Sequence, residues 1–385
     1  MIDTITLAFK EDQYIITDTK YFVGRSTKQI NGRFSISSTF SDMATQSKKQ
    51  GKYFPHVEIP KRTVGKDRSE SSYLLVQVSI PKLLYGTNLF EIDETNYSDF
   101  CQRLSQELRK VKVIVTPDNV ADAIVKRVDL CKSIILPAYF GTAKQVIYRL
   151  QKFNHKPDSD FTIKEFRDGS KEFFLKYLNT TQGYVIYDKA AEMVANGYTD
   201  IELPIVKHLK DGKLIRRILR FELSLQRQQS LEALLRRHIP GKEKGFTVKD
   251  LFSNKQALRN ILLEVFDRIY SPAHTLLVTL SEMQENEFEL QLQSLSNLTL
   301  QQRTTLAYFA NKTTKYGLKA TLAEMKEDMT PSTYNRYKKD LKDIFANMNT
   351  LGLEQPNLIQ YLRSEHEQFK LFTPNKTANT IVNHC

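Results

Sequence analysis

Hydrophobic and polar residues alternate along several stretches of the first 227 residues, and this period of two is typical of a half-buried β-strand. The stretches predicted as strands are 4–9, 34–38, 73–80, 111–115, 121–131, 173–178, 183–189 and 214–226. The last is the clearest, because Leu219, Phe221 and Leu223 share one face while Arg220 and Glu222 share the other. A short polar turn is expected to join the strands at 173–178 and 183–189 into a hairpin.

Other segments carry apolar residues at intervals of three or four, which is the spacing of an amphipathic α-helix. Helices are expected on this basis at residues 97–110, 141–153 and 190–196, and from residue 228 onward the pattern is helical. The prediction is an α+β protein, with an antiparallel-sheet domain at 1–227 and an all-α region at 228–385.

Polar side chains occupy strand positions where apolar residues would be equally suitable. Five of these residues lie on three predicted strands, and the sixth, Glu192, lies one helical turn after the strand at 183–189. They are Asp129, Tyr187, Lys189, Glu192, Arg220 and Glu222. Carboxylates bind Mg²⁺, a tyrosine can attack a phosphodiester, and a lysine can stabilise the charge that develops on phosphate oxygens. One face of an antiparallel sheet is also normally solvated, and spacing alone favours that structural explanation.

The charge balance indicates the class of partner. The chain has 385 residues, with 56 Lys and Arg against 44 Asp and Glu, which gives a formal net charge of +12. An excess of positive charge favours a polyanionic partner such as nucleic acid, although a basic globular protein without such a partner has the same balance.

Several classes of protein are excluded or disfavoured by what the chain lacks. No apolar run approaches the roughly 20 residues that span a bilayer, and the N-terminus does not have the pattern of a signal peptide. The three cysteines are widely spaced and predict neither disulfides nor a zinc site. The chain has no GxGxxG, GxxxxGK[ST] or HExxH motif, and we expect a reduced, cytoplasmic protein that does not bind membranes.

Four short segments share one order along the first 225 residues: VSIPKLLYGTN at 78–88, KRVD at 126–129, YVIYDKAAE at 184–192 and LRFE at 219–222. In this order they resemble the replication-initiator endonucleases of filamentous phages and related plasmids, the gene II/gene X family. The resemblance covers most of the predicted sheet domain. Each segment alone is a weak signal, whereas the ordered set is fairly specific.

The resemblance implies a rolling-circle initiator with a sheet like that of Rep and relaxase nickases. Such a protein nicks one strand of supercoiled origin DNA with a tyrosine and a divalent cation, Mg²⁺ or Mn²⁺, stays joined to the 5′ phosphate, and later rejoins the strand. Tyr187 matches the nucleophile and Lys189 its basic partner. Asp129 and Glu222 match acidic positions assigned to the metal, with Glu192 as a third ligand.

The resemblance also implies partners and shows departures. Origin DNA, single-stranded and double-stranded, would be bound in the cytoplasm of a bacterial host, where helicase and polymerase would follow. The chain has no His-hydrophobic-His pair, and Gln77 stands where many relatives carry an acid. Three histidines, His56, His155 and His208, could contribute to the site, but an ordinary surface or core role is the simpler reading of each.

A basic segment near the C-terminus predicts a second DNA contact. Thr330 and Pro331 have the residue types of an N-cap and first helical turn, and the helix they begin follows another helix that ends near Met329. Its candidate DNA-contacting residues are Asn335, Arg336, Lys338 and Lys339, to which the sheet adds Arg220. This helix-turn-helix-like pair suits the major groove, although a solvated basic helix in a bundle has the same pattern.

Three functional hypotheses remain from the sequence. The first is the nicking and rejoining initiator, and the second is a non-catalytic DNA-binding initiator or repressor that retains the fold. The third is an RNA-binding protein, which the absence of an RNP aromatic pair and of a GxxG loop disfavours. Retention of Tyr187, Lys189, Asp129 and Glu222 favours the first over the second.

Overall fold

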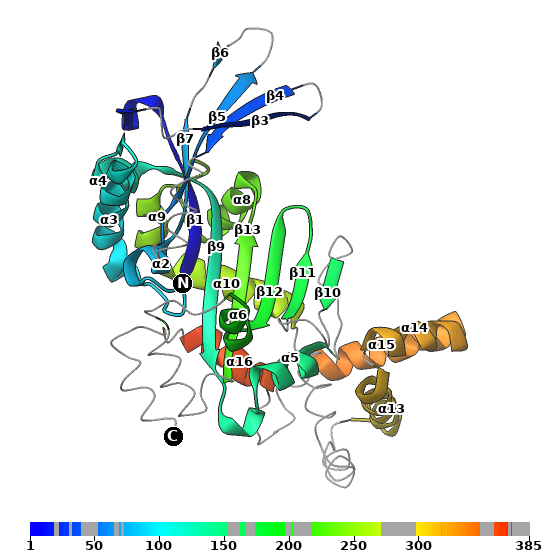
Figure 1. Cartoon of the computed structure of the whole chain (residues 1–385). Helices are drawn as coiled ribbons and strands as arrows, with labels where there is room; N and C mark the ends of the chain where they lie inside the picture. Colours follow the sequence, from blue (N-terminus) through cyan, green and yellow to red (C-terminus); the bar gives the residue numbers. More distant parts are fainter. Residues whose placement is uncertain are drawn as a thin grey trace.

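A large antiparallel β-sheet forms the centre of the molecule (Figure 1). The structure, a computed structural model, describes residues 1–18, 23–30, 33–39, 53–64, 69–70, 73–151, 162–165, 174–196, 202, 217–270, 298–316, 318–346, 358–368 and 371. Several helices pack around the sheet, so the predicted α+β class with an antiparallel sheet is confirmed.

The described strands of this sheet number eleven, and their order is β10-β11-β12-β13-β9-β1-β7-β5-β4-β3, with β6 paired to β5. Their bounds are β1 (Ile2–Phe9), β3 (Val23–Ile30), β4 (Arg33–Thr39), β5 (His56–Val64), β6 (Ser69–Glu70), β7 (Leu74–Ser79), β9 (Ile124–Ile135), β10 (Thr162–Glu165), β11 (Phe174–Leu178), β12 (Gln182–Asp188) and β13 (Ile218–Leu225). Two further short strands, β2 (Ile15–Ile16) and β8 (Val113–Ile114), pair separately.

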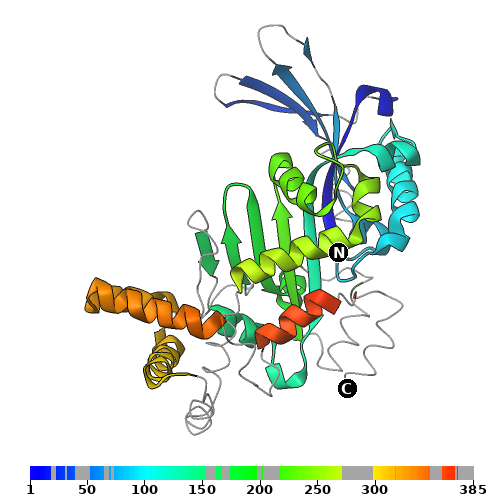
Figure 2. The same ribbon diagram turned by 180° about the vertical axis from the view of Figure 1, so that it is seen from behind.

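The described α-helices lie before, between and after these strands. Their bounds are α2 (Ile80–Tyr85), α3 (Tyr97–Lys110), α4 (Pro117–Asp122), α5 (Ala143–Gln151), α6 (Lys189–Asn196), α8 (Gln228–His238), α9 (Val248–Ser253), α10 (Lys255–Ile269), α13 (Leu300–Tyr316), α14 (Leu318–Asp328), α15 (Pro331–Ala346) and α16 (Leu358–Gln368). Figure 2 shows that α10 and α16 lie across one face of the sheet, opposite the face that carries α6.

The alternation in β13 explains which face is covered. Phe221 and Leu223 are almost fully buried and belong to the same apolar cluster as Leu235, Leu258 and Phe266 of the covering helices. Burying such side chains is the main source of stability in a domain of this kind. The hydrophobic core is therefore continuous across residue 228, the predicted boundary between the two regions.

The core under α16 also contains charged and titratable groups. His366 packs against the rings of Phe221 and Phe266, with centroid separations of 4.8 and 4.7 Å. Burial lowers the pKa of His366 to about 4, so the imidazole is neutral at pH 7. Nearby, the fully buried Lys132 forms an ion pair with Glu91 at 3.7 Å.

Two sequence predictions differ from the structure. Residues 121–131 were expected to be a strand, but α4 occupies the chain as far as Asp122 and β9 continues to Ile135. The helix begins where it does because Thr116 accepts a hydrogen bond from the Asn119 backbone N–H at 3.1 Å. Of the strand expected at 111–115, only the two residues of β8 are in β-conformation.

Candidate functional site

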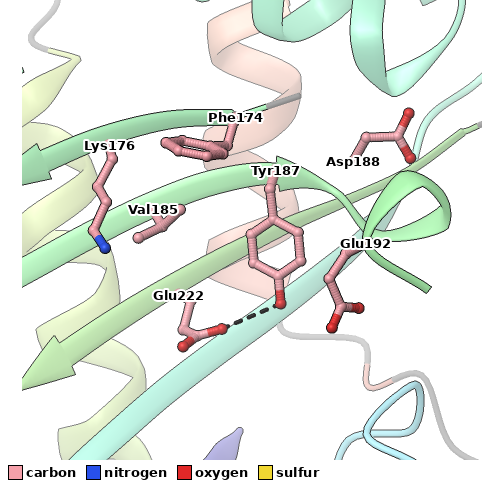
Figure 3. Close-up of a pocket in the computed structure, with 7 residues that line it drawn as sticks. All are labelled: Phe174, Lys176, Val185, Tyr187, Asp188, Glu192 and Glu222. Carbon is pink, nitrogen blue, oxygen red and sulfur yellow. Dashed lines mark hydrogen bonds between the residues drawn. The ribbon is translucent and has the colours of Figure 1, made fainter. Parts of the chain in front are cut away.

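A pocket lies on the face of the sheet opposite α10 and α16, between β11, β12, β13 and the first turn of α6 (Figure 3). Its volume is about 210 Å³. The lining residues are Phe174, Lys176, Val185, Tyr187, Asp188, Glu192 and Glu222. Three of the residues predicted from the sequence, Tyr187, Glu192 and Glu222, therefore line the same cavity.

Tyr187 and Glu222 are joined by a hydrogen bond across two strands. Antiparallel pairing of β12 and β13 sets Val185 opposite Glu222 and Tyr187 opposite Arg220. The Tyr187 hydroxyl donates to Glu222 Oε2 at 3.2 Å, and both side chains are half-buried. Burial raises the pKa of Tyr187 well above its ordinary value of 10, and Arg220 opposes the rise. The hydroxyl therefore needs a proton acceptor before it can act as a nucleophile.

The Glu222 carboxyl has the pKa of such an acceptor. Burial raises the pKa of Glu222 to about 7, with further increases from the negative charges of Asp3 and Asp129, while Arg220 opposes them. A carboxyl that titrates near pH 7 can receive a proton from a bound group and release it again at neutral pH.

Arg220 is fully buried and lies across the strand pair from Tyr187, and its contact with DNA stays a prediction. Its Nη1 donates to the backbone carbonyl of Asn88, and its Nη2 lies 3.5 Å from Asp3 Oδ1. Its Nε and Nη2 have no hydrogen-bond partner. The guanidinium places a fixed positive charge beside Tyr187, which favours the ionised form of the phenol.

Asp3 is a member of this cluster that the sequence analysis did not identify. The pairing of β1 with β9 shifts register between Ile2, which pairs with Leu130, and Thr4, which pairs with Asp129, so Asp3 is the extra residue of a β-bulge. The bulge brings the Asp3 carboxylate, only 6% exposed, to the same face as Arg220. The sequence signal was an acid at the start of an alternating apolar run.

Lys189 and Glu192 form a buried ion pair at the start of α6. The Lys189 ammonium is fully buried and donates to Glu192 Oε2 at 2.6 Å and to Asn88 Oδ1 at 2.8 Å. Burial lowers the pKa of Lys189, and Arg220 lowers it further. Burial alone would raise the pKa of Glu192. The positive charge and hydrogen bond of Lys189 outweigh the effect of burial, so the pKa of Glu192 is lowered. The lowered pKa of Glu192 favours its ionised carboxylate beside the Lys189 ammonium.

Asn88 is a second residue without an assigned role in the sequence analysis, although it ends the segment at 78–88. Its side chain contacts Lys189 and its backbone carbonyl contacts Arg220. The chain reaches this place because α2 ends at Gly86, whose φ of 74° is in the left-handed region that glycine adopts readily. One loop residue thus links both buried cations.

Asp129 is buried and held by two neighbours. The Arg127 guanidinium donates to its two carboxylate oxygens at 3.2 and 2.8 Å, and Ser224 Oγ donates as well. With Asp129 and Glu192 each paired to a cation, the carboxylates as placed do not form a ligand set. Across the described ranges, no three His, Cys, Asp or Glu side chains are arranged to hold a metal ion. The metal-binding roles of Asp129, Glu192 and Glu222 stay predictions.

The other two tyrosines of the hairpin lie on the opposite face of the sheet. Tyr177 and Tyr184 are each 1% exposed, and the Tyr177 hydroxyl lies 3.3 Å from that of Tyr270. Among the three hairpin tyrosines, Tyr187 alone lines the pocket. His56 is the exposed first residue of β5, and His155 and His208 lie outside the described residues.

The predicted basic helix is present as α15. The Thr330 hydroxyl accepts from the Thr333 backbone N–H at 3.4 Å, as an N-cap does. The side chains proposed from the sequence are all exposed, namely Asn335, Arg336, Lys338 and Lys339. On the other side of the helix, Tyr337 packs near Tyr308 of α13, with a centroid separation of 6.5 Å.

Comparison with protein-family models, with curated proteins and with solved structures gives no match for this chain. Within the described chain, every helix is too short or too polar to cross a membrane.

Proposed function

We propose that the chain is a rolling-circle replication initiator that nicks one strand of origin DNA and later rejoins it. The observation that supports this most strongly is the Tyr187–Glu222 hydrogen bond on the wall of an open pocket. It pairs a candidate nucleophile with a carboxyl whose pKa is about 7. The sheet would then be of the Rep and relaxase type.

The proposed cleavage step is a transfer of one phosphodiester bond from DNA to protein. Glu222 takes the proton of the Tyr187 hydroxyl, and the phenolate oxygen attacks the phosphorus atom. The bond from phosphorus to the 3′ oxygen breaks, and that oxygen leaves and takes up a proton. The 5′ phosphate is then joined to Tyr187. Attack by the 3′ hydroxyl of a DNA strand reverses the step and restores the tyrosine.

The buried cations fit the charge changes in this step. Arg220 stabilises the phenolate, because it lies across the strand pair from Tyr187 and is held by Asp3 and Asn88. Lys189 adds a second positive charge, which Asn88 and Glu192 hold in place. Fixed charges in a water-poor site stabilise a transition state without the cost of reorganising solvent.

The exposed face of α15 suits the recognition of duplex DNA. Arg336, Lys338 and Lys339 would contact phosphates, and the exposed Asn335 would contact a base edge if the helix enters a major groove. In this proposal α14 and α15 act as a helix-turn-helix-like unit, and host helicase and polymerase act after the nick in the bacterial cytoplasm.

Incubation with supercoiled DNA of the encoding replicon and Mg²⁺, followed by denaturing electrophoresis, tests the proposal. We expect open-circular DNA with protein attached to the 5′ end of the nick, and neither product with Tyr187→Phe. The phenylalanine variant should still retard the duplex. Retardation by the wild-type chain without any nick would instead support a non-catalytic DNA-binding initiator.

A further inference from the structure

One end of the pocket has a chemistry that the cleavage step does not use. Phe174 and Lys176 enter the pocket from the same face of β11. Strand pairing sets Phe174 opposite Tyr187 and Lys176 opposite Val185. Figure 3 shows the Phe174 ring beside Tyr187 and the Lys176 ammonium farther along the pocket, away from Asp188.

Both side chains line the wall of the pocket and keep part of their surface exposed. Phe174 is half-buried but does not belong to the hydrophobic core of the described residues. Lys176 is also half-buried, and it forms no hydrogen bond or ion pair with any described residue. The pocket thus has at one end an aromatic ring and a cation that no described residue pairs with, and the Tyr187–Glu222 pair lies beside them.

We infer that Phe174 and Lys176 form a subsite for the nucleotide beside the scissile phosphodiester of single-stranded DNA. This inference rests on the proposed function and names the substrate contacts of the same site. The base stacks on Phe174, and Lys176 contacts the next phosphate. An aromatic ring accepts the face of any base once that base has left a duplex, so the subsite should bind single strands with little sequence preference.

The test measures binding without cleavage, in chains that carry Tyr187→Phe. The probe is a fluorescein-labelled 20-nucleotide oligothymidylate, read by fluorescence anisotropy over a series of salt concentrations. The test variants are Phe174→Leu, which keeps an apolar side chain, and Lys176→Gln. The matched controls are Tyr139→Leu, since Tyr139 is 67% exposed outside the pocket, and Lys10→Gln, which removes an exposed charge at the end of β1.

We expect both test variants to bind the oligonucleotide roughly tenfold more weakly than the parent, and both controls to bind as the parent does. Lys176→Gln should also reduce the slope of log affinity against log salt by about 0.7, because one fewer counterion is released. Phe174→Leu should leave that slope unchanged, since it removes no charge.

An oligonucleotide with abasic sites throughout separates the two contacts. Phe174→Leu should bind it as the parent does, because no base remains to stack, whereas Lys176→Gln should still bind it more weakly. Unchanged oligothymidylate affinity in both variants, with circular dichroism showing that they are folded, would overturn the inference. The inference would also be overturned if Phe174→Leu lost as much affinity for abasic DNA as for oligothymidylate.

The result is independent of whether the chain cleaves DNA. Loss of single-strand binding in these variants, together with a wild-type chain that forms no covalent product, would support the subsite and contradict the proposed cleavage. Cleavage by the wild-type chain, together with unchanged oligothymidylate binding in both test variants, would contradict the subsite alone.

Discussion

Replacement of Glu222 by glutamine removes the group that we assign as the proton acceptor while keeping an oxygen for the Tyr187 hydroxyl. In the folded chain the Glu222 pKa is about 7, against an ordinary value of 4.5, because the carboxyl is buried near Asp3 and Asp129. A group with a raised pKa binds its proton more tightly in the folded state than in the unfolded state. Folding stability therefore falls as the pH rises from 4.5 through 7.

The size of this effect follows from the two pKa values. At 1.36 kcal/mol per pKa unit, ionising Glu222 in the folded chain costs at most about 3 kcal/mol at pH 8 and less than about 1 kcal/mol at pH 5. Glutamine does not ionise and avoids this cost. Glu222→Gln should therefore stabilise the chain at pH 8 relative to the wild type by up to about 3 kcal/mol, and by less than about 1 kcal/mol at pH 5.

Urea unfolding followed by circular dichroism is the suitable assay, because the chain has no tryptophan to report by fluorescence. Glu243→Gln, which removes an exposed carboxyl, serves as the matched control and should show no such pH dependence. Glu222→Gln should also differ from the wild type and from the control in the pH dependence of its nicking rate. The wild-type and control rates should rise with pH through about 7 as Glu222 ionises, whereas Glu222→Gln should be slow at every pH. A stability difference that is the same at pH 5 and pH 8 would refute the reasoning.

The remaining predictions concern the cation and the duplex contact. Excess EDTA should abolish nicking and Mg²⁺ should restore it, because the carboxylates that line the pocket repel a DNA phosphate unless a cation offsets them. Asp129→Asn, at a predicted metal ligand, should raise the Mg²⁺ concentration that nicking requires. Full cleavage in EDTA would contradict both expectations. Reversing Arg336, Lys338 and Lys339 to glutamate should weaken binding to all duplexes and flatten its salt dependence, while cleavage of single-stranded origin oligonucleotides persists. Asn335→Ala should relax sequence preference by about 1–3 kcal/mol in competition binding, and unchanged preference would exclude a base contact.

Local patterns identified the faces of the strands because alternation depends only on neighbouring residues. The sequence placed Phe221 on one face of β13 and Glu222 on the other, and the structure has both there. It also predicted the helix at 97–110 with the bounds that α3 has. These predictions required no knowledge of which strands are adjacent.

The contacts between distant segments could not be predicted in this way. Asp3 reaches the site through a register shift between β1 and β9, and no pattern within either strand specifies a bulge. Asn88 reaches Lys189 and Arg220 only because a loop far from both in the sequence folds over the sheet. Lys132 lies just beyond the strand predicted at 121–131, yet the structure places it within β9 and buries it against Glu91.

The most direct test of the central claim is to locate the DNA on the covalent product by mass spectrometry. Trypsin should release residues 177–189 as one peptide that contains Tyr177, Tyr184 and Tyr187, so fragment ions have to distinguish them. We predict a phosphodeoxynucleotide on Tyr187, because it is the one of the three that lines the pocket and hydrogen-bonds to Glu222. A nucleotide on Tyr184 or Tyr177, or a nicked product with no protein attached, would contradict the proposal.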